Sequence, residues 1–246
     1  MDPHVKSFGE HLADFRRLLV QVLVCLFIGI SVSLPLAPRV YAWLKIPFER
    51  SGLDVTLRVT QVGGGFSVFL RVSLWSGLLL SFPVLVVLVA LYLLPALHER
   101  ERWLAWQLGG ASFGLFLLGS WMAYHGTVPV ALRFMTRVEN WMETPAIFWE
   151  VDSYIRFVVR LLLAFGVAFQ LPVLIVLLGR AGFVTTQQLR SSRRYVITGL
   201  SVLAMLLTPP DPFTMVLMAL PLIVLFEMTI WLLVGMDKAR PKVLRT

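Results

Sequence analysis

The sequence predicts an all-α integral membrane protein with six transmembrane helices. Hydrophobic residues make up 58% of its 246 residues, charged residues make up 15%, and the mean hydropathy is +0.80. A soluble globular chain is usually about 45–50% apolar and roughly 25% charged. The apolar residues form blocks of about 20, the length that a helix needs to cross a hydrocarbon core of ~30 Å. The blocks lack the alternating pattern of barrel strands, so helices are the structure that satisfies their backbone groups in lipid.

Six segments are apolar enough to span. They cover residues 18–37, 66–94, 103–124, 154–178, 195–207 and 213–235, with Pro83 inside the second and Pro172 inside the fourth. The fifth segment has 13 residues, which reach only ~20 Å as a helix. The fifth and sixth segments are therefore expected to form a hairpin that stops short of the far headgroups, where the bilayer is thinned or a partner fills the gap.

The distribution of basic residues predicts that both termini are cytoplasmic. With the N-terminus inside, the inner segments carry 13 lysines and arginines and the outer segments carry six, as the positive-inside rule requires. The loops are too short to fold separately, so the chain is expected to form one membrane domain over residues 1–246. The aromatic-rich outer loops, residues 38–65 and 125–153, are expected to form a structured cap at the membrane interface.

Two carboxylates stand among arginines at inner helix ends. Asp14 lies in the segment His11–Arg17, just before the first span, and Glu101 lies in the link between the second and third spans. A carboxylate is the natural bidentate partner of a guanidinium. If the two acids converge, they form a receptor for two positive charges on a partner. The alternatives are a solvated face of an interfacial helix around Asp14 and a charge cluster around Glu101 that compensates itself.

Polar residues at membrane depth are few. Gln170 and Glu227 are the two candidate functional residues at this depth, because a polar group there faces protein or water rather than lipid. Gln170 cannot titrate, and it suits either contacts between helices or a polar groove. Glu227 can titrate or pair with another helix. Arg156 and Arg160 are expected to extend outward to the interface or to pair with acids at the start of the fourth span.

Several classes of protein are disfavoured. The net charge of +8 follows the membrane topology rather than one basic stripe, which argues against nucleic-acid binding. The single cysteine, Cys25, and four scattered histidines give no metal cluster. No nucleotide-binding or hydrolase motif is present, so neither a cofactor nor an enzymatic activity is expected. The first apolar run is full length with no cleavage site after it, which disfavours a removable signal peptide.

The chain resembles the TatC family, the multispanning core subunit of the twin-arginine protein translocase, over nearly its whole length. The resemblance rests on seven blocks in order. They are His11-Leu12-x-Asp14-Phe15-Arg16-Arg17-Leu18; Phe82-Pro83 with Pro95-x-Leu97-x-x-x-Glu101-Arg102; Ala123-Tyr124 with Pro129; Tyr154-Ile155-x-Phe157 with Phe165-Gly166-x-x-Phe169-x-x-Pro172; Arg193-Arg194-Tyr195; Leu207-Thr208-Pro209-Pro210-Asp211; and Pro221-Leu222 with Phe226-Glu227.

The resemblance implies six helices in a concave, cupped bundle in the bacterial cytoplasmic (inner) membrane. It implies binding of twin-arginine signal peptides of folded precursor proteins, assembly with single-span TatA/TatB-type subunits, self-association in a larger complex, and use of the proton-motive force. The family's signal-peptide carboxylates match Asp14 and Glu101. Other positions that the family treats as functional match Arg16, Arg102, Leu97, Tyr92, Pro47, Phe66, Tyr124 and Asp211.

Three residues depart from the family pattern. The first family acid is usually glutamate, and Asp14 is one methylene shorter. The family's mid-membrane glutamate is Gln170 here, so a charge at that position cannot be essential. A glutamine that often follows the last turn is Met215 here, which removes a polar group from that position.

Our hypothesis is that the protein is a non-enzymatic receptor and core subunit for protein export. Asp14 and Glu101 hold the two arginines of a signal peptide, whose apolar segment lies along the cupped face near Gln170. The alternatives are a secondary transporter of a small solute, favoured by proline-broken helices, and a membrane-bound enzyme, for which no catalytic constellation is found.

Overall fold

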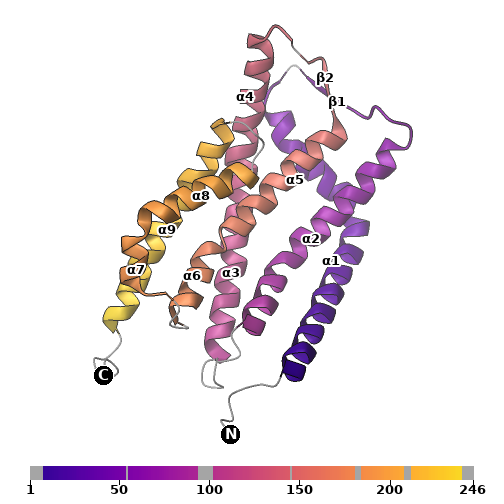
Figure 1. Cartoon of the computed structure of the whole chain (residues 1–246). Helices are drawn as coiled ribbons and strands as arrows, with labels where there is room; N and C mark the ends of the chain where they lie inside the picture. The colour runs from indigo at the N-terminus through magenta and orange to yellow at the C-terminus, as the bar shows by residue number, and fades with distance from the viewer. Residues whose placement is uncertain are drawn as a thin grey trace. The chain divides into compact units, whose positions relative to one another are not determined.

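The structure is a computed structural model that describes residues 8–53, 55–93, 102–144, 146–180, 184–207 and 212–239. Most of these residues are helical, and two short strands accompany the helices (Figure 1). The chain divides into two compact units. The first unit comprises residues 1–45 and 59–114, and the second comprises residues 46–58 and 115–246.

Two long helices, α1 (Phe8–Arg50) and α2 (Gly64–Leu93), run side by side in the first unit (Figure 1), and the last residues of α1, from Ile46 on, belong to the second unit. Small residues let their backbones approach closely. A Cβ on Gly77 would lie 2.6 Å from the Cα of Ile30. Within the same seam the Ser81 hydroxyl donates to the carbonyl of Cys25 over 3.1 Å. The contact between these helices therefore depends on close backbone packing and on hydrogen bonds between them.

The helix α1 is much longer than the apolar segment that predicts it. The expected span was residues 18–37, whereas α1 begins at Phe8 and continues through Pro38 and Pro47 to Arg50. Apolar residues mark the part of a helix that lipid surrounds. The backbone hydrogen bonds of a helix form within the helix itself, so the helix can continue beyond the lipid. Part of the predicted outer loop 38–65 is therefore helical.

The second unit holds most of the remaining helices. The third helix α3 (Arg102–Met122) enters it from the first unit, and the helices α4 (Val128–Trp141), α5 (Val151–Ala168), α6 (Leu171–Arg180), α7 (Thr186–Ser191), α8 (Arg193–Leu207) and α9 (Pro212–Ala239) follow. Its core contains the fully buried side chains of Phe116, Phe165, Leu132, Ile155, Leu162 and Met218. These side chains come from α3, α4, α5 and α9, so the unit has a shared apolar centre.

The third span does not end where it was predicted to end. In place of a loop after residue 124, a π-helical turn (Ala123–Thr127) leads directly into α4. Pro129, the second residue of α4, follows the π-helical turn, and because it has no N–H it leaves a carbonyl of that turn without a helical donor. The amphipathic α4 buries Val128, Ala131 and Leu132, and this burial stabilises a helix within the predicted loop 125–153.

The fourth predicted span, residues 154–178, consists of two helices. The α5 helix ends at Ala168, Phe169 and Gln170 form a turn, and α6 begins at Leu171. Pro172 has no N–H to donate to the carbonyl of Ala168, and its ring would clash there. The proline favours the break that is observed, although α1, α2 and α9 continue through internal prolines.

The two predicted outer loops meet in a short parallel pair of strands, β1 (Thr56–Arg58) and β2 (Phe148–Glu150). Thr56 pairs with Phe148 and Arg58 with Glu150. Aromatic side chains pack beside them: the Phe48 ring lies 5.9 Å from Trp149 and 5.4 Å from Tyr154. This part of the second unit is thus held by backbone pairing and by buried rings.

Five helical segments among the described residues are long and apolar enough to cross a membrane. They are Leu12–Arg50, Gly64–Val89, Gly109–Trp141, Val151–Gly179 and Pro212–Gly235. The remaining predicted span corresponds to α8, whose 15 residues give a length of ~22 Å. Each of the six apolar segments thus corresponds to helical structure in the described residues. The fourth segment is divided between α5 and α6, and the fifth, α8, is shorter than the other spans.

Candidate functional site: a helix-end acid and polar groups at helix breaks

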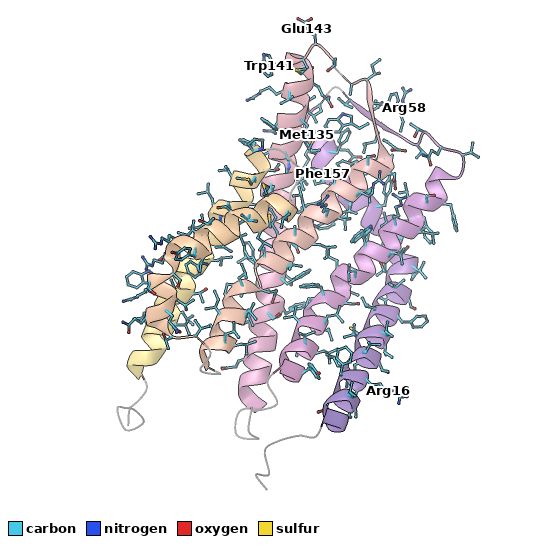
Figure 2. The ribbon with its side chains drawn as sticks, viewed as in Figure 1. Arg16, Arg58, Met135, Trp141, Glu143 and Phe157 are labelled. Carbon is cyan, nitrogen blue, oxygen red and sulfur yellow. The ribbon has the colours of Figure 1, made fainter. Side chains whose placement is uncertain are left out.

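The first candidate site lies near the start of α1. Asp14 is half-buried, whereas Arg16 and Arg17 are exposed, and Arg16 extends away from the helix (Figure 2). Leu12, Phe15 and Leu19 share one stripe of the helix and are about half exposed. This turn of α1 therefore combines an apolar stripe with charged side chains.

The end of α2 lies beside this turn. The rings of Phe15 and Tyr92 are 6.2 Å apart. The α3 helix packs against α2. A Cβ on Gly109 of α3 would lie 3.2 Å from Cγ2 of Val87 of α2. Counting residues along two antiparallel helices places Arg102, the first residue of α3, about level with the end of α2. Asp14, Tyr92 and the start of α3 therefore gather at one end of the first unit.

Some predicted site residues lie outside the described part of the chain. Leu97 and Glu101 fall between α2 and α3, Asp211 falls between α8 and α9, and only the backbone of Arg102 is described. Their predicted roles stay predictions.

Gln170 lies at the break between α5 and α6 and is 9% exposed. Its backbone N–H bonds to the carbonyl of Val167 over 2.9 Å, which leaves the carbonyl of Gly166 without the usual helical donor. The side-chain Nε2 of Gln170 donates to that same carbonyl over 3.3 Å. The amide thus replaces the backbone donor that the turn has moved, a role that needs an N–H group but no charge.

Replacing Gln170 with leucine is expected to lower the free energy of unfolding by about 1–3 kcal/mol, because a buried carbonyl loses its donor. Glutamate should be tolerated only when protonated, since a carboxylate has no proton to donate. Thermal unfolding of the purified variants in detergent at pH 5 and pH 8 measures both effects. A Gln170→Glu variant that is equally stable at both pH values would contradict this role for the amide.

Both ends of α8 are tied to neighbouring helices. At its start, Arg193 forms an ion pair of 3.0 Å with Glu227 of α9, so Glu227 pairs with another helix, one of the two roles open to it. At its end, Arg160 of α5 donates to the carbonyl of Leu206 over 3.2 Å. A cation at a helix C-terminus also interacts favourably with the helix dipole.

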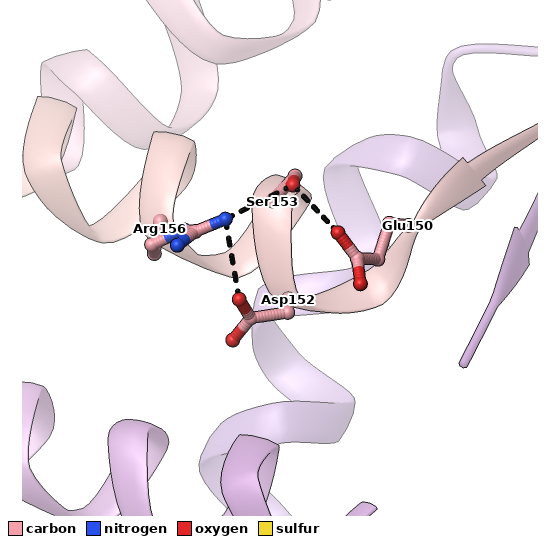
Figure 3. A network of polar contacts seen from close by, with 4 residues as sticks. All are labelled: Glu150, Asp152, Ser153 and Arg156. Atoms are coloured by element: carbon pink, nitrogen blue, oxygen red, sulfur yellow. Dashed lines mark hydrogen bonds and ion pairs between the residues drawn. The ribbon is translucent and has the colours of Figure 1, made fainter. Parts of the chain in front are cut away.

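A polar network fixes the start of α5 (Figure 3). Arg156 pairs with Asp152 over 3.2 Å and donates to the hydroxyl of Ser153, which donates to Glu150 over 3.0 Å. The expected pairing of Arg156 with a nearby acid is confirmed. The contact of Arg160 with a carbonyl was not predicted, because an acceptor on the main chain leaves no mark in the sequence.

The other predicted positions have contrasting environments. Pro47 is buried, and Tyr124 is 3% exposed within the π-helical turn. Phe66 is 66% exposed and stacks on Phe69 at 6.4 Å. Among the described residues, no three histidine, cysteine or acidic side chains come together to hold a metal ion.

Long apolar helices, with polar groups at helix ends and breaks, define a multi-span membrane protein whose polar side chains join its helices to one another. The comparisons with known proteins identify its family. Residues 10–221 match the family model described as "Sec-independent protein translocase protein (TatC)". The chain belongs to the TatC family.

Individual relatives are similar over most of their length. The Sec-independent protein translocase protein TatC of Aquifex aeolicus (strain VF5) is 34% identical, with 91% of this chain and 92% of that protein covered. The protein of the same name from Escherichia coli (strain K12) is 32% identical, with 90% and 85% covered. A crystal structure of the twin-arginine translocase receptor TatC in DDM has a TM-score of 0.79 at 32% identity and covers 91% of this chain and 99% of that one.

The family and the all-α membrane fold expected from the sequence are thereby confirmed. The chain is a core subunit of the twin-arginine translocase and a multi-span protein of the bacterial inner membrane. It is a protein translocase component rather than an enzyme. A small-solute transporter is not favoured by these relatives.

Proposed function

We propose that this subunit is the receptor for twin-arginine signal peptides, and that Asp14 and Glu101 bind the two guanidinium groups at the cytoplasmic face. The contact between Phe15 and Tyr92 carries the proposal, since it brings the turn of Asp14 beside the end of α2. Glu101 directly precedes the first residue of α3. The proposal therefore assigns both acids to the same binding surface.

The chemistry of this end suits an arginine pair. A guanidinium presents planar donors that match a carboxylate bidentately, and the half-buried setting of Asp14 strengthens such a contact relative to one in water. The ring of Tyr92 is near enough to lie against an arginine or an apolar residue of the peptide. Arg16, Leu97 and Arg102 complete the proposed binding surface.

The remaining features of the family reading form part of the same proposal. Both termini are cytoplasmic, the chain acts as one membrane domain with a cupped bundle, and translocation uses the proton-motive force. Single-span TatA/TatB-type subunits dock near the hairpin of α8 and α9, and copies associate in a larger complex. Support comes from the short α8 and from its exposed side chains Val202, Met205 and Leu206, which leave apolar surface for another helix.

Site-specific photocrosslinking tests the receptor role. A photoreactive phenylalanine analogue at Tyr92 is expected to crosslink to a twin-arginine signal peptide and to lose most of the yield when the peptide carries two lysines. The matched control is the same analogue at Trp75, an exposed aromatic residue of the same helix that lies ~26 Å away along its axis and has no assigned role. Equal yields from the two positions would contradict the proposed site.

A further inference from the structure

A corner between two helices carries basic side chains that the receptor role does not use. Arg190 lies in the last turn of α7, and Arg194 lies in the first turn of α8. The N–H of Ser192 bonds to the carbonyl of Gln188 over 2.9 Å, and the N–H of Val196 bonds to the carbonyl of Ser192 over 3.0 Å. The α7 helix ends at Ser191 and α8 begins at Arg193, so Arg190 and Arg194 lie on either side of a tight turn at Ser192, four residues apart in the sequence.

Among the described side chains, Arg190 and Arg194 have no acidic partner. The sequence has no aspartate or glutamate between Asp152 and Asp211. Glu227 reaches the corner from α9, but it is paired with Arg193. Arg190 and Arg194 are both exposed, and neither has a carboxylate partner within the described residues. Counted over the side chains that the structure describes, the corner has an excess of positive charge.

One guanidinium is already oriented. Nη2 of Arg194 donates to the hydroxyl of Tyr195 over 2.9 Å, and its Cζ lies 4.7 Å from the centre of the tyrosine ring. A guanidinium has five N–H donors, so the contact with tyrosine leaves others for an anion. Pre-orientation reduces the entropy lost when a ligand binds.

The position of the corner indicates which anion is present. Tyr195 is 65% exposed, and the exposed apolar side chains Val202, Met205 and Leu206 follow it along α8. Tyrosine and arginine at the end of an apolar helix lie at the depth of the lipid headgroups. This depth holds whichever side of the membrane the corner faces.

We propose that Arg190, Arg194 and Tyr195 form a binding site for the phosphate headgroup of an anionic phospholipid, which anchors the start of α8 at the membrane surface. Arginine suits the phosphate because its planar donors match two phosphate oxygens. Tyr195 holds the guanidinium of Arg194, and the acyl chains of the lipid stay in the bilayer beside the start of α8. The positive-inside topology places the site in the cytoplasmic leaflet.

Native mass spectrometry of the purified protein in detergent, titrated with phosphatidylglycerol, tests this site. The test variant is Arg190→Gln with Arg194→Gln. Its matched control is Arg133→Gln with Arg137→Gln, which removes two exposed arginines one turn apart on α4. The test variant is expected to bind phosphatidylglycerol about 25-fold more weakly, since each of its two lost basic residues contributes about fivefold. The control is expected to bind as the native protein does.

Two further titrations distinguish an anionic phospholipid from a neutral lipid and from a free phosphate. Phosphatidylcholine should bind weakly, and glycerol phosphate should not displace phosphatidylglycerol. Should the glutamine variant fail to fold, Arg190→Lys with Arg194→Lys keeps the charge and is expected to lose about fivefold, because the bidentate geometry is lost. Equal binding of both lipids, displacement by glycerol phosphate, or unchanged binding by the glutamine or lysine variant would overturn the proposal.

Discussion

Replacing Gly166 with alanine is expected to destabilise the second unit by about 1–3 kcal/mol, the usual effect of adding a group to a well-packed core. A Cβ at this position of α5 would lie 2.4 Å from Cε2 of Phe116. Phe116 is completely buried, so its ring cannot move aside without disturbing the core. Thermal unfolding in detergent measures the effect, at about 2–4 °C per kcal/mol for a chain of this size.

The control for this prediction is Gly114→Ala. A Cβ on Gly114 of α3 would meet nothing within 4 Å, and alanine is the better helix former. This variant is expected to be as stable as the native protein or slightly more stable. A Gly166→Ala variant with the melting temperature of the control would contradict the close packing of α5 on Phe116.

Reversing the charge at Asp14 is expected to weaken the binding of a twin-arginine peptide by at least 30-fold. Loss of one partner from a desolvated charge pair costs about 2–5 kcal/mol, and a lysine adds repulsion toward the incoming arginines. Asp14→Glu keeps the carboxylate, so it should stay within a few-fold of the native affinity. Titration of a fluorescent signal peptide against the purified variants gives these affinities.

The same change elsewhere serves as the control. Asp152→Lys alters the net charge identically, but Asp152 belongs to the network at the start of α5 and pairs with Arg156. It is expected to leave peptide affinity unchanged, although it removes an ion pair. If both lysine variants weaken binding equally, the effect comes from net charge rather than from recognition by Asp14.

Apolar patterning located the membrane spans, but it did not locate the helix ends. Leu18 begins the first apolar segment and Ala37 ends it, yet α1 runs from Phe8 to Arg50. Hydropathy reports where lipid surrounds a helix, whereas the helix itself continues wherever its backbone stays bonded. Pro172 marks a possible break in the sequence, but Pro83 and Pro221 lie inside continuous helices, so only the structure shows which proline interrupts its helix.

The candidate site was predictable in its residue types and less so in its contacts. Asp14 and Tyr92 stand out through motifs, and the contact between Phe15 and Tyr92 shows how the chain brings them together. The bond from Arg160 to the carbonyl of Leu206 has no sequence signal, because every residue carries a carbonyl. The donation by Gln170 to Gly166 depends on a turn whose geometry only the structure gives.

A double-mutant cycle between the protein and its peptide tests the central claim most directly. Four affinities are measured: the native protein and an Asp14→Ala, Glu101→Ala variant, each with an arginine-arginine peptide and with a lysine-lysine peptide. If the two carboxylates bind the two guanidinium groups, the native protein has a much higher affinity for the arginine peptide than for the lysine peptide. The variant then binds both peptides with similar affinity. A variant that keeps the native preference for arginine would contradict the account, because recognition would then lie elsewhere.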